Sequence, residues 1–197
     1  MNDENIPEEK YIVTHKKELI IGVAISVGVI AIIIAMVLSI AASTPKVVYQ
    51  PTKACDLLTI EESKDLLGEK TLQSGEKTPA QSGNTASSQC GYTDGNPDTD
   101  SMLVAAVVVR SGVNDKGVEQ NKTEFTAGKP DQGVEDVKGV GDQAYYNQKL
   151  GQLNILDGRN WIILSYGPGA SPEENTLDNS LKMAQKVITS TASVSNF

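Results

Sequence analysis

An uncharged and almost entirely aliphatic stretch runs from Leu19 to Ala42. At about 1.5 Å of rise per residue, a helix of this length reaches roughly 36 Å, which is enough to cross a hydrocarbon core of about 30 Å. The sequence therefore predicts a single membrane-spanning helix over residues 19–42, with the lipid bilayer as a partner of the chain.

The lysines beside this stretch predict its orientation. Lys16 and Lys17 directly precede it, and positive residues next to a span mark the cytoplasmic side. We expect residues 1–18 to be a cytoplasmic tail and the C-terminal part to be extracytoplasmic, at the cell membrane. A cleaved signal peptide is the alternative, because Ser39 and Ala41 have the spacing of a cleavage site. Apolar cores of signal peptides run only about 7 to 15 residues, which favours a retained anchor.

Beyond the span, the chain reads as a linker and one domain. Pro45 and Pro51 favour extended backbone over residues 43–54, and residues 55–197 have the size of one domain with a single core. The whole chain has a formal charge of −8. From Ser43 onward, 14 Lys and Arg face 20 Asp and Glu, which gives −6. This balance predicts no nucleic-acid partner, since phosphate neutralisation needs a basic face.

The two cysteines, Cys55 and Cys90, both fall on the predicted extracytoplasmic side. In an oxidising compartment we expect them to form one disulfide. The segment between them includes Gln73 to Gln89, which has almost nothing to bury and is predicted to be irregular. A metal site or a thiol nucleophile is the alternative. A metal site would need further ligands and a thiol nucleophile would need a base. The only histidine, His15, precedes the predicted span and supplies neither.

Hydrophobic periodicity predicts the secondary structure. Thr59 and Glu62 form the pattern of a capping box that opens a helix ending near Gly68. The valine-rich run Met102 to Val109 predicts a central strand. The other expected elements are a strand at Gly91 to Thr93, a helix at Gly117 to Phe125, and strands at Gln143 to Asn147, Gln152 to Asp157 and Asn160 to Tyr166, with a tight turn at Asp157-Gly158.

A last helix is predicted from Ser171, Pro172 and Glu174, which have the order N-cap, first-turn proline and capping-box acid. Apolar residues then recur at helical spacing from Leu177 to Ile188. The order is helix, two strands, helix, three strands and helix. It predicts an α+β fold in which helices pack on an antiparallel sheet.

Three pieces of the sequence stand out by their order and spacing: Ala54-Cys55-Asp56-Leu57-Leu58-Thr59 followed by Glu62 and Leu67-Gly68, then Cys90-Gly91-Tyr92, and then Gly139-Val140-Gly141-Asp142-Gln143-Ala144-Tyr145. Together they resemble a family of secreted actinobacterial lipoproteins that share a domain of unknown function, and related extracytoplasmic domains of bacterial envelope proteins. The resemblance implies an α+β domain with a Cys55–Cys90 bridge, an envelope location and no catalytic motif. The chain departs from the family in having an apolar span in place of a lipid-modified cysteine, and Tyr92 where the family usually has tryptophan.

The inventory of reactive groups predicts a protein that is not an enzyme and has no cofactor. Gly139 and Gly141 fit the letters of a dinucleotide fingerprint, but that motif must open a helix. Since a strand is expected after them, we favour a turn. Asp94, Asn96, Asp98 and Asp100 have the alternation of a calcium loop, yet Ala105 stands where the bidentate Glu belongs. A turn between strands explains them better.

Four aromatic residues on the predicted strands are candidates either for core packing or for lining a ligand pocket: Tyr145, Tyr146, Trp161 and Tyr166. The function favoured by the sequence is an envelope binding or sensing module whose ligand is a protein, a lipid or a cell-wall fragment. A hydrolase that uses carboxylates such as Asp94 and Asp98, or a pilin-like structural subunit, is the alternative.

Overall fold

The computed structural model describes residues 47–194, with side chains up to residue 188. The predicted cytoplasmic tail, the predicted span and the first part of the predicted linker lie outside the described residues. Within residues 47–194, no helix combines the length and apolarity that a membrane crossing requires. The elements are α2 (Ala54–Leu57), α3 (Ile60–Leu67), β1 (Leu72–Ser82), β2 (Thr85–Thr93), β3 (Leu103–Gly112), α4 (Asp115–Ala127), β4 (Val134–Val137), β5 (Gln143–Asn147), β6 (Gln152–Asp157), β7 (Asn160–Pro168), the 3-10 turn η1 (Pro172–Glu174) and α5 (Leu177–Val194).

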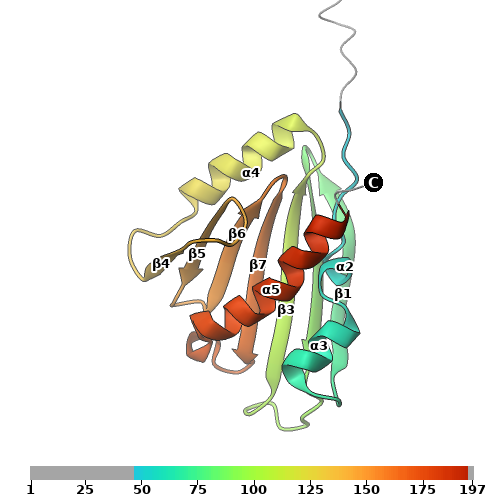
Figure 1. The fold of residues 1–197 in the computed structure, drawn as a ribbon, viewed down its shortest axis with the longest axis vertical. Coiled ribbons are helices and arrows are strands. Elements are labelled where there is room, and N and C mark those ends of the chain that lie inside the picture. Colours follow the sequence, from blue (N-terminus) through green and yellow to red (C-terminus); the bar gives the residue numbers. More distant parts are fainter. Residues whose placement is uncertain (1–46, 195–197) are drawn as a thin grey trace, which may run out of the picture. The chain divides into compact units, whose positions relative to one another are not determined.

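The centre of the domain is a seven-stranded sheet with the order β1-β2-β3-β7-β6-β5-β4 (Figure 1). Every neighbouring pair is antiparallel. The two halves of the chain meet where β3 pairs with β7, from Leu103 opposite Pro168 to Ser111 opposite Asn160. The predicted α+β fold with an antiparallel sheet is therefore confirmed.

The hairpin β1–β2 corrects the expectation that Gln73 to Gln89 is irregular. This segment supplies most of both strands, joined by a turn at Gly83, whose φ is 62°. β1 is an edge strand whose side chains are almost all exposed, so it needs no apolar residues. The strand is held by backbone hydrogen bonds to β2 rather than by burial of apolar side chains. Pro79 lies where the register shifts between Lys77 and Ala80, as expected for a strand at a sheet edge.

Helices cover the two faces of the sheet unequally. Helices α2, α3 and α5 lie across one face (Figure 1), and the larger core forms there around fully buried side chains such as Val107, Leu164 and Met183. Alternate strand residues point to the other face, where α4 contributes Phe125 to a smaller cluster with Tyr145 and Leu156. The disulfide joins Cys55 of α2 to Cys90 of β2 on the side of the larger core, which confirms the predicted pairing.

The local signals for the helix starts are only partly confirmed. Thr59 and Glu62 form the predicted capping box of α3. Ser171, however, makes no capping hydrogen bond, and its segment forms the short turn η1 rather than the start of the last helix. Asn175 interrupts the helix because tertiary hydrogen bonds hold it: its carbonyl accepts from the Tyr146 hydroxyl, and its Nδ2 donates to the Gly151 carbonyl at 3.2 Å.

The second half of the predicted linker is part of the domain. We call residues 49–54 the N-terminal strap. The Tyr49 amide donates to the Val113 carbonyl at 2.9 Å, and the Tyr49 hydroxyl donates to Asp115 Oδ1 at 2.7 Å. The Arg159 guanidinium lies 5.5 Å from the centre of the Tyr49 ring. These contacts hold the strap against one end of the sheet.

Candidate functional site

A cleft of about 510 Å³ opens between the end of α4 and the connection from β4 to β5. Phe125, Thr126 and Lys129 line one side of it, and residues 136–145 line the other. This volume falls within the range of about 300 to 1,000 Å³ typical of small-ligand sites. The cleft is therefore the candidate binding site of the domain.

Aromatic rings form the apolar part of the cleft. The ring centres of Phe125 and Tyr145 lie 5.1 Å apart, and Phe125 also packs edge-on against Trp161 at 5.9 Å. Phe125 and Tyr145 are each only 3% exposed. Burial raises the pKa of the Tyr145 phenol, and its hydroxyl forms no hydrogen bond with any residue that the structure describes. It is free to bond a ligand.

Charged side chains of both signs line the cleft. Lys129, just after the end of α4, forms an ion pair with Asp136 on β4, and this pair links the two walls. Lys138 is exposed just after β4. Asp142 uses its Oδ2 to accept the Gly158 amide at 2.8 Å. Two lysines and two aspartates make the lining electrically neutral overall, in a domain that is otherwise acidic.

The glycines of the cleft form a turn, as predicted. Gly139 and Gly141 have φ of 77° and 58°, a region that L-residues other than glycine rarely occupy. A Cβ on Gly141 would meet the Leu156 carbonyl oxygen at 2.6 Å. The segment leads into strand β5 and opens no helix, so it lacks the strand–turn–helix context of a dinucleotide site.

The segment Asp94 to Asp100 connects β2 to β3, which agrees with the turn interpretation. Its side chains accept backbone amides two residues ahead: Asp94 from Asn96 at 3.0 Å, Asn96 from Asp98 at 3.0 Å, and Asp98 from Asp100 at 3.2 Å. The Ser101 hydroxyl donates to the other oxygen of Asp98. Within the described residues, no group of three or more His, Cys, Asp or Glu is arranged to hold a metal ion. Asp94, Asn96 and Asp98 therefore act as local caps of the backbone.

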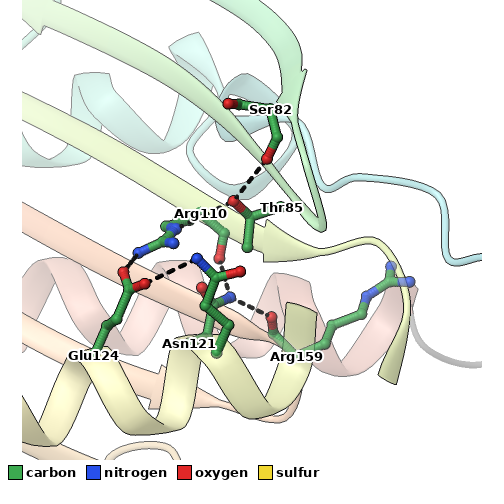
Figure 2. Close-up of polar contacts among 7 residues, drawn as sticks. Ser82, Thr85, Arg110, Asn121, Glu124 and Arg159 are labelled. Carbon is green, nitrogen blue, oxygen red and sulfur yellow. Dashed lines mark hydrogen bonds and ion pairs between the residues drawn. The ribbon is translucent and has the colours of Figure 1, made fainter. Parts of the chain in front are cut away.

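A polar cluster under α4 was not predicted from the sequence (Figure 2). Arg110 on β3 forms an ion pair with Glu124, and the Arg110 Nε donates to the Thr85 hydroxyl at 3.3 Å. Asn121 is fully buried and donates through Nδ2 to the carbonyls of Arg110 and Arg159, at 2.8 and 2.9 Å. Only the fold brings β3, α4 and the β6–β7 turn together. The cluster fixes α4, and thereby one wall of the cleft.

The four candidate aromatics separate onto the two faces. Tyr145 and Trp161 belong to the α4 side, where the Trp161 Nε1 donates to Asn154 Oδ1 at 3.2 Å. Tyr146 and Tyr166 pack with the larger core, and the Tyr166 hydroxyl donates to the Leu66 carbonyl at 2.6 Å. Core packing accounts for most of these rings, and Tyr145 is the one that also lines the cleft.

Comparisons of the chain with protein-family models, with curated proteins and with solved structures found no match.

Proposed function

We propose that this chain is a membrane-anchored binding module of the bacterial cell envelope, which holds a ligand in the cleft between α4 and the β4–β5 connection and performs no catalysis. The single observation that carries this proposal is the cleft itself. It combines a buried aromatic wall, a free tyrosine hydroxyl and charges of both signs in a volume of about 510 Å³. A few polar groups around an apolar surface are typical of small-ligand sites.

The membrane location is supported by the sequence and by the disulfide. The apolar stretch at residues 19–42 is long enough to span a bilayer, and a structural disulfide suits an extracytoplasmic compartment. The resemblance to envelope lipoproteins through Cys55, Cys90 and the turn at Gly139 points the same way. In this topology residues 1–18 are cytoplasmic and the described domain is outside.

The binding proposal is tested by NMR on the full chain in lipid nanodiscs, with methyl labels on Val137, Val140 and Ala144, which line the cleft. The probes are short peptides, cell-wall glycan fragments and fatty acids. We expect at least one class to shift these three methyl signals in a saturable way. Shifts confined to methyl groups elsewhere, or no shift with any probe, would contradict the proposal.

A pair of variants sharpens this test. T126W places a large ring in the lining of the cleft, whereas T123W places the same ring one turn earlier on α4, at an exposed position outside the lining. We expect T126W to abolish the ligand-induced shifts and T123W to leave them. Equal binding by both variants would show that the ligand binds elsewhere.

The topology has a separate test. A protease added to intact cells should remove the domain from Ser43 onward and leave residues 1–18 protected. Complete protection of the domain would refute an extracytoplasmic location.

A further inference from the structure

The charges of the cleft are balanced within a strongly acidic domain. From Ser43 onward the chain carries six more acidic than basic residues, yet the lining contains Lys129 and Lys138 against Asp136 and Asp142. A site for a simple anion would be expected to carry an excess of positive charge, and a site for a cation an excess of negative charge. A neutral lining with both signs is complementary to a neutral ligand that itself carries both signs.

One positively charged and one negatively charged side chain of the lining can each still bind a group of the ligand. Lys138 is exposed, and its ammonium forms no ion pair with a residue of the described domain. Asp142 commits Oδ2 to the Gly158 amide, while its Oδ1 accepts no hydrogen bond from a described residue. By contrast, Lys129 and Asp136 neutralise each other across the two walls. Lys138 is therefore the group for a ligand carboxylate, and Asp142 the group for a ligand ammonium.

The aromatic wall requires that the ligand also has an apolar part. Phe125 and Tyr145 line the cleft and are already almost fully buried, so an apolar group of the ligand that packs beside them is itself removed from water. The Tyr145 hydroxyl, which has no partner in the described domain, can bond a peptide group of the ligand. A purely apolar ligand would bury the charges of Lys138 and Asp142 without pairing them, which costs free energy.

We propose that the cleft binds a small zwitterion with an apolar body, of the class of free amino acids and short peptides with unblocked ends. Lys138 binds the carboxylate, Asp142 binds the ammonium, and the rings of Phe125 and Tyr145 contact the apolar side chain. This inference rests on the proposed function, because it names the ligand class of the same cleft.

The test uses the full chain in nanodiscs and isothermal titration with alanyl-phenylalanine, as the free dipeptide and in its N-acetylated and C-amidated forms. We expect each blocking group to weaken binding at least tenfold. Equal affinity for all three forms would overturn the proposal and indicate an apolar ligand. Sensitivity to amidation alone would overturn it in favour of an anion site.

Variants that each remove one charge test which side chain binds the carboxylate of the dipeptide and which binds its ammonium. In K138Q, the free and amidated dipeptides should bind equally, while acetylation still weakens binding. In D142N, which retains an oxygen for the Gly158 amide, the free and acetylated forms should bind equally. K149Q and D178N remove exposed charges outside the cleft and should keep the preferences of the wild type. A variant that loses affinity for all three forms alike would contradict the assignment.

Failure of this inference is distinguishable from failure of the proposed function. If a glycan fragment or a fatty acid shifts the methyl signals of Val137, Val140 and Ala144 while the dipeptide does not, the cleft is a binding site and the zwitterion assignment is wrong. If no probe shifts them, both proposals fail.

Discussion

The Ser88 hydroxyl donates a hydrogen bond to the Thr52 carbonyl at 2.9 Å and accepts one from the Ala54 amide at 3.0 Å. A single side chain of β2 thus satisfies two backbone groups of the N-terminal strap. Ser88 is 3% exposed, so water cannot readily replace it. The strap is fastened to the sheet at this point.

Replacement of Ser88 should destabilise the domain. In S88A the Thr52 carbonyl and the Ala54 amide lose their partner in a buried setting, which should lower the free energy of unfolding by about 1–3 kcal/mol. Urea denaturation measures the change. S87A, at the exposed neighbouring position of the same strand, is the control and should change stability little. Equal effects of the two substitutions would show that the strap is not fastened by Ser88.

Reduction of the disulfide should lower the melting temperature. Cys55 and Cys90 are 35 positions apart, and a closed loop of this size removes about 3–4 kcal/mol of chain entropy from the unfolded state. Calorimetry with and without reductant measures the effect. The double variant C55S/C90S is the control, since its melting temperature should not respond to reductant. An unchanged melting temperature of the wild type on complete reduction would contradict a structural role.

Removal of the Asn121 amide should loosen α4. In N121A the carbonyls of Arg110 and Arg159 lose their donor, and the expected loss of stability is about 1–3 kcal/mol. N121D should be worse, because a carboxylate would face two carbonyl oxygens in a buried position. K122A, at the adjacent exposed position, serves as the reference. Hydrogen exchange of the α4 amides would report the loosening directly, and unchanged protection in N121A would refute it.

The ion pair between Arg110 and Glu124 should make stability depend on pH in the acid range. The hydrogen bond from Arg110 holds the pKa of Glu124 below its ordinary value of 4.5. A carboxyl group with a lowered folded-state pKa contributes stability above its unfolded pKa and loses it as the pH falls through the folded pKa.

The difference in melting temperature between wild type and E124Q should therefore be constant from pH 7 to about pH 5.5 and shrink below about pH 4.5. E119Q removes an exposed carboxylate from the same helix and controls for the change in net charge. A difference that stays constant down to pH 3 would show that the pair contributes nothing.

Two glycines of one turn should respond differently to alanine. Both have positive φ, so each substitution incurs backbone strain of about 1–2 kcal/mol. At Gly139 a Cβ would meet no atom within 4 Å, whereas at Gly141 it would collide with the Leu156 carbonyl at 2.6 Å and Ile155 Cγ2 at 2.7 Å. G141A should therefore lose clearly more stability than G139A in urea denaturation. Equal losses would mean that the turn shifts freely away from β6.

Periodicity and capping signals predicted the elements that bury apolar residues or carry local caps. The run Met102 to Val109 became β3, and Thr59 and Glu62 became the capping box of α3. These signals lie within a few positions along the chain. The exposed edge strand β1 gave no such signal, because its stability comes from hydrogen bonding to β2.

The candidate site was accessible to prediction only in part. The sequence singled out Gly139, Gly141 and Tyr145, which all line the cleft. It gave no indication of Lys129 and Asp136, because each is an ordinary surface charge until the fold brings the segment after α4 next to β4. The cluster of Arg110, Asn121 and Glu124 depends in the same way on contacts between elements that periodicity does not connect.

The position of Cys55 has a mechanical consequence. It directly follows the N-terminal strap, and its sulfur is bonded to Cys90 in the second strand of the sheet. A force that pulls the chain from its N-terminal side would strip the strap up to Cys55 and then pass through the sulfur–sulfur bond into β2. Residues 56–89 would carry none of this load. Under tension, the covalent bridge makes the sheet, rather than the helices α2 and α3, the part of the domain that resists.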